Sequence, residues 1–155
     1  MLVEFDKISD DSRIWVYASE KRLAIDERHY ILDSISNHIK DWESHQKPLK
    51  AAVKILEDYF IIVALDESYQ KASGCSIDTL QKNIQSIEKE LNISILGRLN
   101  VYVIKKGEIE SIPLFKLKDS VDHDTLFYDL TINYKKEIET YLKPIKDGWC
   151  SNYLD

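Results

Sequence analysis

The residues best placed to do chemistry lie in one short stretch, between Asp66 and Asp78. Its centre reads Ala-Ser-Gly-Cys-Ser-Ile-Asp and places Cys75 at the start of a predicted helix. The free backbone N–H groups and the dipole at a helix N-terminus stabilise negative charge, so they favour a thiolate or a bound anion there. Cys75 is therefore the one candidate catalytic residue. The candidate ligand-binding residues are Asp66, Ser73, Gly74, Cys75, Ser76, Asp78, Arg98 and His45.

Each of these residues also has a purely structural interpretation. A small thiol before a helix is commonly packed and inert, and no C-x-x-C spacing gives Cys75 a resolving partner. Ser73, Ser76 and Asp78 are typical turn and cap residues, because their side chains accept hydrogen bonds from the first N–H groups of a helix. Asp66 ends a strand, and the carboxylate after it points to the opposite face. A functional Cys75 would have to be exposed in a pocket bounded by Asp66 and the helix start.

The histidines and arginines give weaker signals. His38, Asp41 and His45 recur at spacings of three and four, which would place three potential metal ligands on one side of a helix. Apolar residues share that neighbourhood and no cysteine joins it, so we predict no metal site. No sequence spacing links His45 to Cys75 as its base. Arg98 could meet an anion near the sheet edge. The glycines form no nucleotide-binding pattern, and we predict no cofactor.

Two elements must position the Cys75 stretch. Residues 59–65 form a short β-branched and aromatic run, which predicts a buried central strand. Apolar residues then recur at spacings of three and four and form one stripe along a helix near 77–91. They are Ile77, Leu80, Ile84, Ile87 and Leu91. Ser76 or Asp78 would cap this helix.

The same criteria predict an α+β protein with an antiparallel sheet. We expect strands near 13–18, 50–56, 59–65 and 99–104, and helices near 26–44 and 77–91. This order, in which each helix buries one stripe, is typical of a ferredoxin-like βαββαβ core. We assign residues 1–155 to a single domain, with the core at about 12–115 and a C-terminal extension of one strand and one helix at about 116–155.

Both faces of the predicted sheet are apolar, which has a consequence for partners. In the first strand, Ile14 and Val16 point to one face, whereas Trp15 and Tyr17 point to the other. Helices on one side alone would leave the second face exposed to water, so a further layer must cover it. Either the C-terminal extension provides this cover, or the aromatic sheet face binds a second copy of the chain or another protein.

Composition restricts partners and location. The chain has a formal net charge of −6 and a sequence pI near 5.3, so on average it repels a phosphate backbone and we expect no nucleic acid partner. Its N-terminus has no basic-then-apolar leader, and its longest apolar run is about a third of a membrane helix. We expect a cytoplasmic protein without membrane contact. Two cysteines are too few for a disulfide framework.

Several stretches of the chain combine into a family-like pattern. They are Arg13-Ile14-Trp15-Val16-Tyr17, Trp42-Glu43-Ser44-His45, Asp66-Glu67, Ala72-Ser73-Gly74-Cys75-Ser76-Ile77-Asp78 and Trp149. Together they resemble a small family of uncharacterised bacterial proteins that often carries the label "ABC transporter ATPase". The resemblance implies family membership and no established activity. No Walker motif is present, so the ATPase label is not taken literally.

These observations favour a non-catalytic binding or assembly module. Two apolar sheet faces and the lack of catalytic motifs support this interpretation. The alternative is a cysteine-dependent enzyme or an anion-binding protein that uses the helix N-terminus at Gly74-Cys75-Ser76. Both forms of the alternative need an open loop around Cys75.

Overall fold

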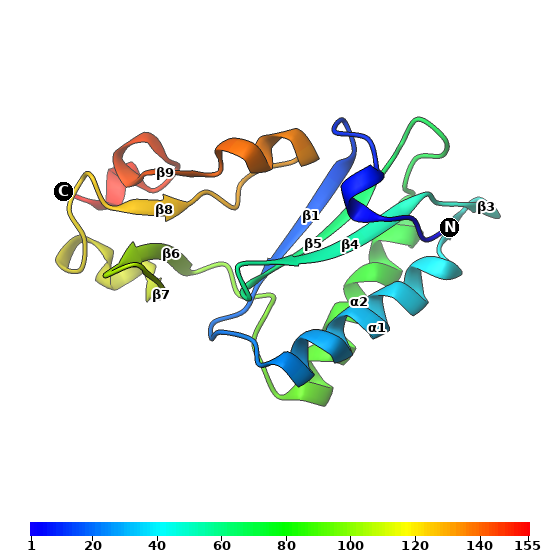
Figure 1. Cartoon of the computed structure of the whole chain (residues 1–155), viewed down its shortest axis with the longest axis horizontal. Coiled ribbons are helices and arrows are strands. Elements are labelled where there is room, and N and C mark those ends of the chain that lie inside the picture. The colour runs from blue at the N-terminus through cyan, green and yellow to red at the C-terminus, as the bar shows by residue number, and fades with distance from the viewer. The chain divides into compact units, whose positions relative to one another are not determined.

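The computed structural model describes residues 1–155 (Figure 1). The helices are α1 (Ile25–Lys40) and α2 (Gly74–Leu91). The strands are β1 (Arg13–Ala18), β2 (Glu43–Ser44), β3 (Lys47–Pro48), β4 (Ala51–Leu56), β5 (Phe60–Leu65), β6 (Asn100–Lys105), β7 (Glu108–Pro113), β8 (Leu126–Tyr128) and β9 (Leu142–Pro144). Short 3-10 helices occupy Phe5–Lys7, Leu114–Asp119, Lys135–Thr140, Ile145–Asp147 and Ser151–Tyr153. Pairing between the named strands is antiparallel, and the predicted α+β class is confirmed.

Contacts within the chain divide it into two compact units. The first unit comprises Met1–Leu96 together with Asn133–Lys136, and the second comprises Gly97–Ile132 together with Glu137–Asp155. Residues 97–115, which we assigned to the same core as the preceding chain, belong to the second unit. The single-domain assignment itself stays a prediction.

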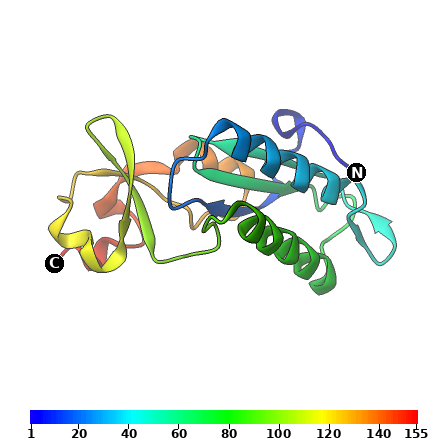
Figure 2. The same cartoon turned by 90° about the horizontal axis from the view of Figure 1, so that it is seen from below.

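The first unit is built around β5, a strand in which all six residues are buried. β5 pairs with β1 on one side and with β4 on the other, which gives the order β1-β5-β4. α1 and α2 lie side by side on one face of this sheet (Figure 1 and Figure 2). The core between helices and sheet includes Leu23, Ile31, Ile35, Ile39, Ile61, Val63, Leu65, Leu80, Ile84 and Ile87. The apolar stripe predicted for the second helix therefore faces the sheet.

Both predicted helices exist, but their ends differ from the prediction. α1 begins one residue early, with Ala24 as its N-cap, and the Ala24 N–H donates to the Glu27 carboxylate at 2.9 Å. α1 ends at Lys40 and not near residue 44, because the chain turns there toward the β2–β3 hairpin. Residues 41–44 therefore lie outside α1 and do not continue its apolar face.

The ferredoxin-like topology is not confirmed, because its fourth strand lies elsewhere. The order β1-β5-β4 is the one expected for the first three strands of that fold, but the strand predicted near 99–104 is β6, which pairs with β7 and β8 in the second unit. Both edges of β6 are thereby occupied. The free edge of β1 instead meets the returning segment Asn133–Lys136, where the Ile14 N–H donates to the Asn133 carbonyl at 2.9 Å.

The aromatic face of β1 is the face that the helices cover. Tyr17 is buried in the core beneath α1 and α2, and the Trp15 ring packs edge-to-face against Trp42 with 5.9 Å between ring centroids. We predicted this face as the surface for a second copy or a protein partner, and that placement is wrong because the chain's own helices occupy it. On the opposite face, Phe60 and Ile62 are also fully buried. Both faces of the sheet are apolar, as predicted.

The second unit contains a four-stranded antiparallel sheet in the order β7-β6-β8-β9. β6 and β7 form a hairpin whose turn residues Lys106 and Gly107 have positive φ. The strand predicted in the C-terminal extension is present as β8, whereas the α-helix predicted after it is wrong. A short 3-10 helix ends at Thr140 and β9 pairs with β8 instead. Pro144 explains this difference in part, because a proline favours an extended conformation in the residue before it.

Phe127 and Gly148 approach each other closely in the core of the second unit. Phe127 is fully buried, and a Cβ added to Gly148 would overlap its ring. The backbone of Gly148 has a φ of −106°, which any residue adopts, so the requirement for glycine here is one of space. The rest of this core consists of Val101, Val103, Ile112, Leu117, Ile145 and Cys150.

Gly148→Ala is therefore expected to destabilise the second unit by about 1–3 kcal/mol, because Phe127 must leave its favoured position to admit a methyl group. Urea unfolding followed by tryptophan fluorescence measures this change. The matched control is Gly74→Ala on the first turn of α2, where an added Cβ would meet no atom within 4 Å. Gly74→Ala is expected to be neutral or to stabilise by up to about 1 kcal/mol. Equal unfolding free energies for the two variants would contradict the close approach of Phe127 to Gly148.

Candidate functional site

The start of α2 is fixed by two serines. Ser73 is the N-cap: its hydroxyl accepts from the Ser76 N–H at 3.1 Å, and the Ser73 N–H donates to the Ser76 hydroxyl at 2.7 Å. The helix begins at Gly74, so our prediction of Ser76 or Asp78 as the cap is wrong. Asp78 is exposed and forms an ion pair with Lys82 one turn further on, at 3.1 Å. Both serine hydroxyls are engaged in capping rather than left for a ligand.

Cys75 lies on the first turn of α2 with its side chain exposed, and it lines a cavity of about 390 Å³. The cavity lies between the end of α1 and the start of α2 and is lined by Asn37, His38, Asp41, Trp42, Glu43, Cys75, Ser76 and Thr79. Its volume falls within the usual range for small-molecule sites, roughly 300–1,000 Å³. Cys75 thus has the exposure and the pocket that a functional role requires. Asp66, however, is not part of the cavity lining.

Trp42 holds the two helices together at this cavity. Its indole Nε1–H donates to the Ser76 carbonyl at 2.8 Å, which ties the end of α1 to the first turn of α2. The Trp42 side chain is 3% exposed and also contacts the Trp15 ring. A buried indole with its N–H satisfied is rigid. Trp42 therefore gives the cavity a fixed, mostly apolar wall.

His38 lines the same cavity and carries a buried polar atom without a partner. Its Nε2 is buried and has no hydrogen-bond partner. Burial lowers the pKa of the His38 imidazole below its ordinary value, so the ring is neutral at neutral pH. The ring lies 5.9 Å from that of Trp42, measured between centroids. Because this nitrogen is closed to solvent, His38 contributes to the cavity as a neutral ring and not as an open hydrogen-bonding site.

The charges around the cavity do not favour an anion. Asp41 and Glu43 contribute two carboxylates, and no lysine or arginine lines the cavity. The Met1 ammonium interacts with Asp41; burial lowers the pKa of this ammonium and Asp41 opposes the shift. The N-terminus of α2 adds a partial charge of about +0.5. One ammonium and this partial charge do not outweigh two carboxylates, so the anion-binding alternative gains no electrostatic support.

Asp66 and Glu67 organise the loop before α2. The Asp66 carboxylate accepts from the Ser68 N–H at 3.0 Å and from the Ser68 hydroxyl at 2.6 Å, and Asp66 is only 8% exposed. The Glu67 carboxylate accepts from the Ala72 N–H at 3.2 Å. The contacts between Asp66 and Ser68 form an Asx turn, and the contact between Glu67 and Ala72 holds the rest of the loop. The two carboxylates therefore shape the path from β5 to α2.

Neither His45 nor Arg98 is among the residues that line the cavity. His45 is exposed at the turn of the β2–β3 hairpin, with a φ of 52°. Arg98 is exposed and belongs to the second unit. Because α1 ends at Lys40, His38 and Asp41 line the cavity without His45. No group of three or more His, Cys, Asp or Glu side chains is arranged to hold a metal ion.

Three lining residues, Asn37, Glu43 and Thr79, were not among the predicted site residues. Thr79 follows Cys75 by four residues, a helical spacing that puts both on one face, so a signal for Thr79 was present. Asn37 and Glu43 join the cavity because the end of α1 lies beside the start of α2. That juxtaposition depends on the sheet order and has no local signal in the sequence.

Comparison of the chain with protein-family models, curated proteins and solved structures gave no match. The family resemblance carried by the Gly74-Cys75-Ser76-Ile77-Asp78 stretch therefore stays a prediction. No helix in the structure combines the length and the apolar character that crossing a membrane requires. The cytoplasmic location also stays a prediction.

Proposed function

We propose that this chain is a non-catalytic binding module whose ligand site is the cavity beside Cys75. The observation that carries the proposal is the cavity itself, about 390 Å³ in volume, which the exposed Cys75 and the rigid Trp42 line. Two carboxylates and the wall formed by Trp42 favour a small uncharged or cationic ligand.

A cysteine-dependent enzyme is the second candidate, and the exposed Cys75 on the first turn of α2 favours it. Cysteine catalysis uses a base within hydrogen-bond reach of the thiol and a third group that orients the base. His38 is the only histidine of the cavity lining, and its Nε2 bonds neither to the Cys75 sulfur nor to any other atom. The lack of this dyad supports binding over catalysis.

A fragment screen by two-dimensional ¹H–¹⁵N NMR tests the proposal. Fragments that bind in the cavity are expected to shift the Trp42 indole N–H signal and the backbone signals of Ser76 and Thr79, because these groups border it. The matched control is Cys75→Trp, which places a large ring at the exposed rim. This variant is expected to lose the fragment-induced shifts while its unfolding free energy changes by less than about 1 kcal/mol.

Two results would contradict the binding proposal. The first is a screen in which no fragment shifts the signals around the cavity. The second is a set of shifts that persists unchanged in Cys75→Trp. Conversion of a bound fragment into a new product, detected by mass spectrometry and abolished in Cys75→Ser, would support the enzyme instead.

A further inference from the structure

β4 is an edge strand, and the chain's own N-terminal segment uses only part of its outer side. The Val3 N–H donates to the Ala51 carbonyl at 2.9 Å, and the Ala51 N–H donates to the Met1 carbonyl at 3.0 Å. Leu2 thereby forms a parallel bridge with Ala51. The segment then leaves the strand and enters the 3-10 helix Phe5–Lys7. At Ala51, the N-terminal segment therefore already pairs with the edge of β4 as an added strand would.

Two further residues of β4 present backbone groups on the same outer side. In an antiparallel ladder, successive residues direct their N–H and C=O groups alternately to the two sides of a strand. Ala51 directs its groups outward, so Val53 and Ile55 do so as well. No hydrogen bond in the structure satisfies these outward groups. Such a row is a template for an added strand.

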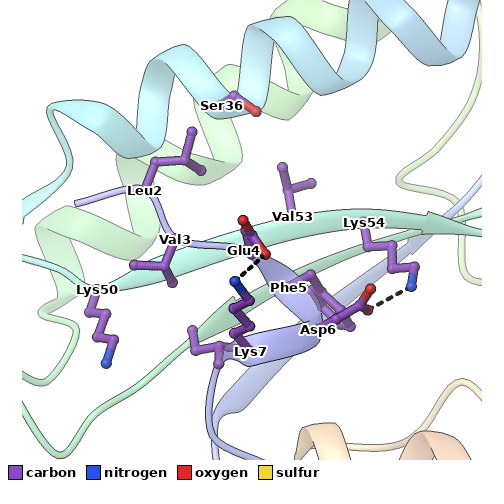
Figure 3. A pocket seen from close by; sticks show the side chains of 11 residues that line it. Leu2, Val3, Glu4, Phe5, Asp6, Lys7, Ser36, Lys50, Val53 and Lys54 are labelled. Atoms are coloured by element: carbon purple, nitrogen blue, oxygen red, sulfur yellow. Dashed lines mark hydrogen bonds and ion pairs between the residues drawn. The ribbon is translucent and has the colours of Figure 1, made fainter.

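A groove accompanies this open edge, and we call it the β4 edge groove. It consists of two cavities, of about 850 Å³ and 330 Å³, which share Val53 and Lys54. Figure 3 shows Val53 pointing from β4 toward α1, while Lys54 reaches Asp6. Leu32 of α1 and Ile55 line the smaller cavity. The groove thus combines unpaired backbone groups with apolar side chains at alternate positions of the strand.

We propose that an extended peptide segment of another protein adds as a strand to β4 at Val53 and Ile55. Its backbone would bond to the outward groups of these two residues, and its alternate apolar side chains would occupy the groove beside α1. A carboxylate of the peptide would bind Lys54, which belongs to both cavities. The partner is therefore an acidic, otherwise apolar segment in extended conformation.

The N-terminal segment of this chain already shows both parts of this recognition. Its backbone pairs with Ala51, and its Asp6 carboxylate accepts from the Lys54 ammonium at 2.8 Å. The Asp6 side chain is 78% exposed, and an ion pair this exposed contributes little to stability. A carboxylate from a peptide partner can therefore replace Asp6. The proposed strand continues an interaction that begins at Ala51.

A second copy of the chain fits this edge less well. Antiparallel pairing that joins Val53 of one copy to Ile55 of the other would place the two Lys54 side chains directly opposite each other. Like charges in that position destabilise a sheet, and an edge lysine is typical of strands protected against self-pairing. A peptide with a carboxylate at this position avoids the repulsion.

Random nine-residue peptides displayed on phage and selected against the full chain provide the probe. Selected peptides are expected to alternate apolar residues and to carry an acidic residue. Their affinity, measured by fluorescence polarisation, is expected to fall at least about tenfold in Val53→Pro, which lacks the outward N–H but suits an edge strand. The matched control Val53→Thr keeps the N–H and is expected to bind within about threefold of wild type.

Modified peptides and one more protein variant distinguish strand addition from other modes of binding. N-methylation of alternate peptide nitrogens is expected to abolish binding for one of the two alternate sets only, because only one set faces β4. Lys54→Glu is expected to weaken binding of the acidic peptides at least about tenfold. Three results would overturn the proposal: no selected peptide, equal binding to wild type and Val53→Pro, or a dimer of the chain that Val53→Pro dissociates.

Discussion

Ile84→Asp is expected to unfold the first unit. Ile84 is fully buried on α2, within the core that α1, α2 and the sheet share. Removal of its side chain alone would cost about 2–5 kcal/mol, and an unpaired carboxylate in its place adds a desolvation penalty of several kcal/mol. Together these costs approach the whole stability of an ordinary domain, about 5–15 kcal/mol. Circular dichroism at 222 nm and urea titration measure the loss.

Ser86→Asp is the matched control for this substitution. It introduces the same side chain two residues further along α2, at an exposed position. Its unfolding free energy is expected to stay within about 0.5 kcal/mol of wild type. A folded Ile84→Asp with stability close to that of Ser86→Asp would mean that α2 does not pack on the sheet through Ile84.

Cys75 is expected to react with iodoacetamide at least about 100-fold faster than Cys150 at pH 8. Burial raises the pKa of the Cys150 thiol to about 11, and its side chain is fully buried. Only the thiolate reacts, and a thiol with that pKa is about 0.1% ionised at pH 8. Cys75 is exposed, so reagent reaches it directly. Mass spectrometry of each cysteine peptide, at intervals and over a range of pH, gives the two rates.

The same measurement in 8 M urea is the control, because unfolding removes the burial of Cys150. The two rates are then expected to agree within about threefold. Under native conditions the Cys150 rate is expected to keep rising as the pH increases toward 11, since each step raises the thiolate fraction. Comparable native rates for both cysteines would contradict the buried position of Cys150.

Strong local patterns predicted the elements of the first unit well. The run at 59–65 became β5, and the stripe through Ile84 became the buried face of α2. Periodicity reports which side of an element is apolar, and this property belongs to the element alone. The ends of helices were less accurate, because a cap depends on hydrogen bonds such as those between Ser73 and Ser76 that several nearby residues could form.

The placement of β6 could not be predicted in the same way. Its apolar and aromatic residues indicate a strand, but they fit any sheet with two buried faces. β6 had two possible positions: beside β1, or between its hairpin partner β7 and β8. The hairpin forms through a tight turn at Lys106 and Gly107, and such a local pairing closes a much shorter loop than a return to β1. The ferredoxin-like order therefore failed at its last strand.

The candidate site was predicted in part. The position of Cys75 at a helix start followed from the apolar stripe after it, and the structure adds its exposure and a cavity. The participation of His38 and Trp42 could not be predicted as part of this site, because they reach it through the packing of α1 against α2. Asp66 was expected at the pocket but turns to Ser68 instead, a local contact that its neighbours make available.

Ligand protection of Cys75 is the most direct test of the binding cavity. The rate of Cys75 alkylation by iodoacetamide is measured without a fragment and at saturating concentration of one selected by the Trp42 indole shift. Because the thiol lines the same cavity as His38 and Trp42, the bound fragment is expected to slow alkylation at least about tenfold. An unchanged Cys75 rate at saturation would contradict the assignment of this cavity as the ligand site.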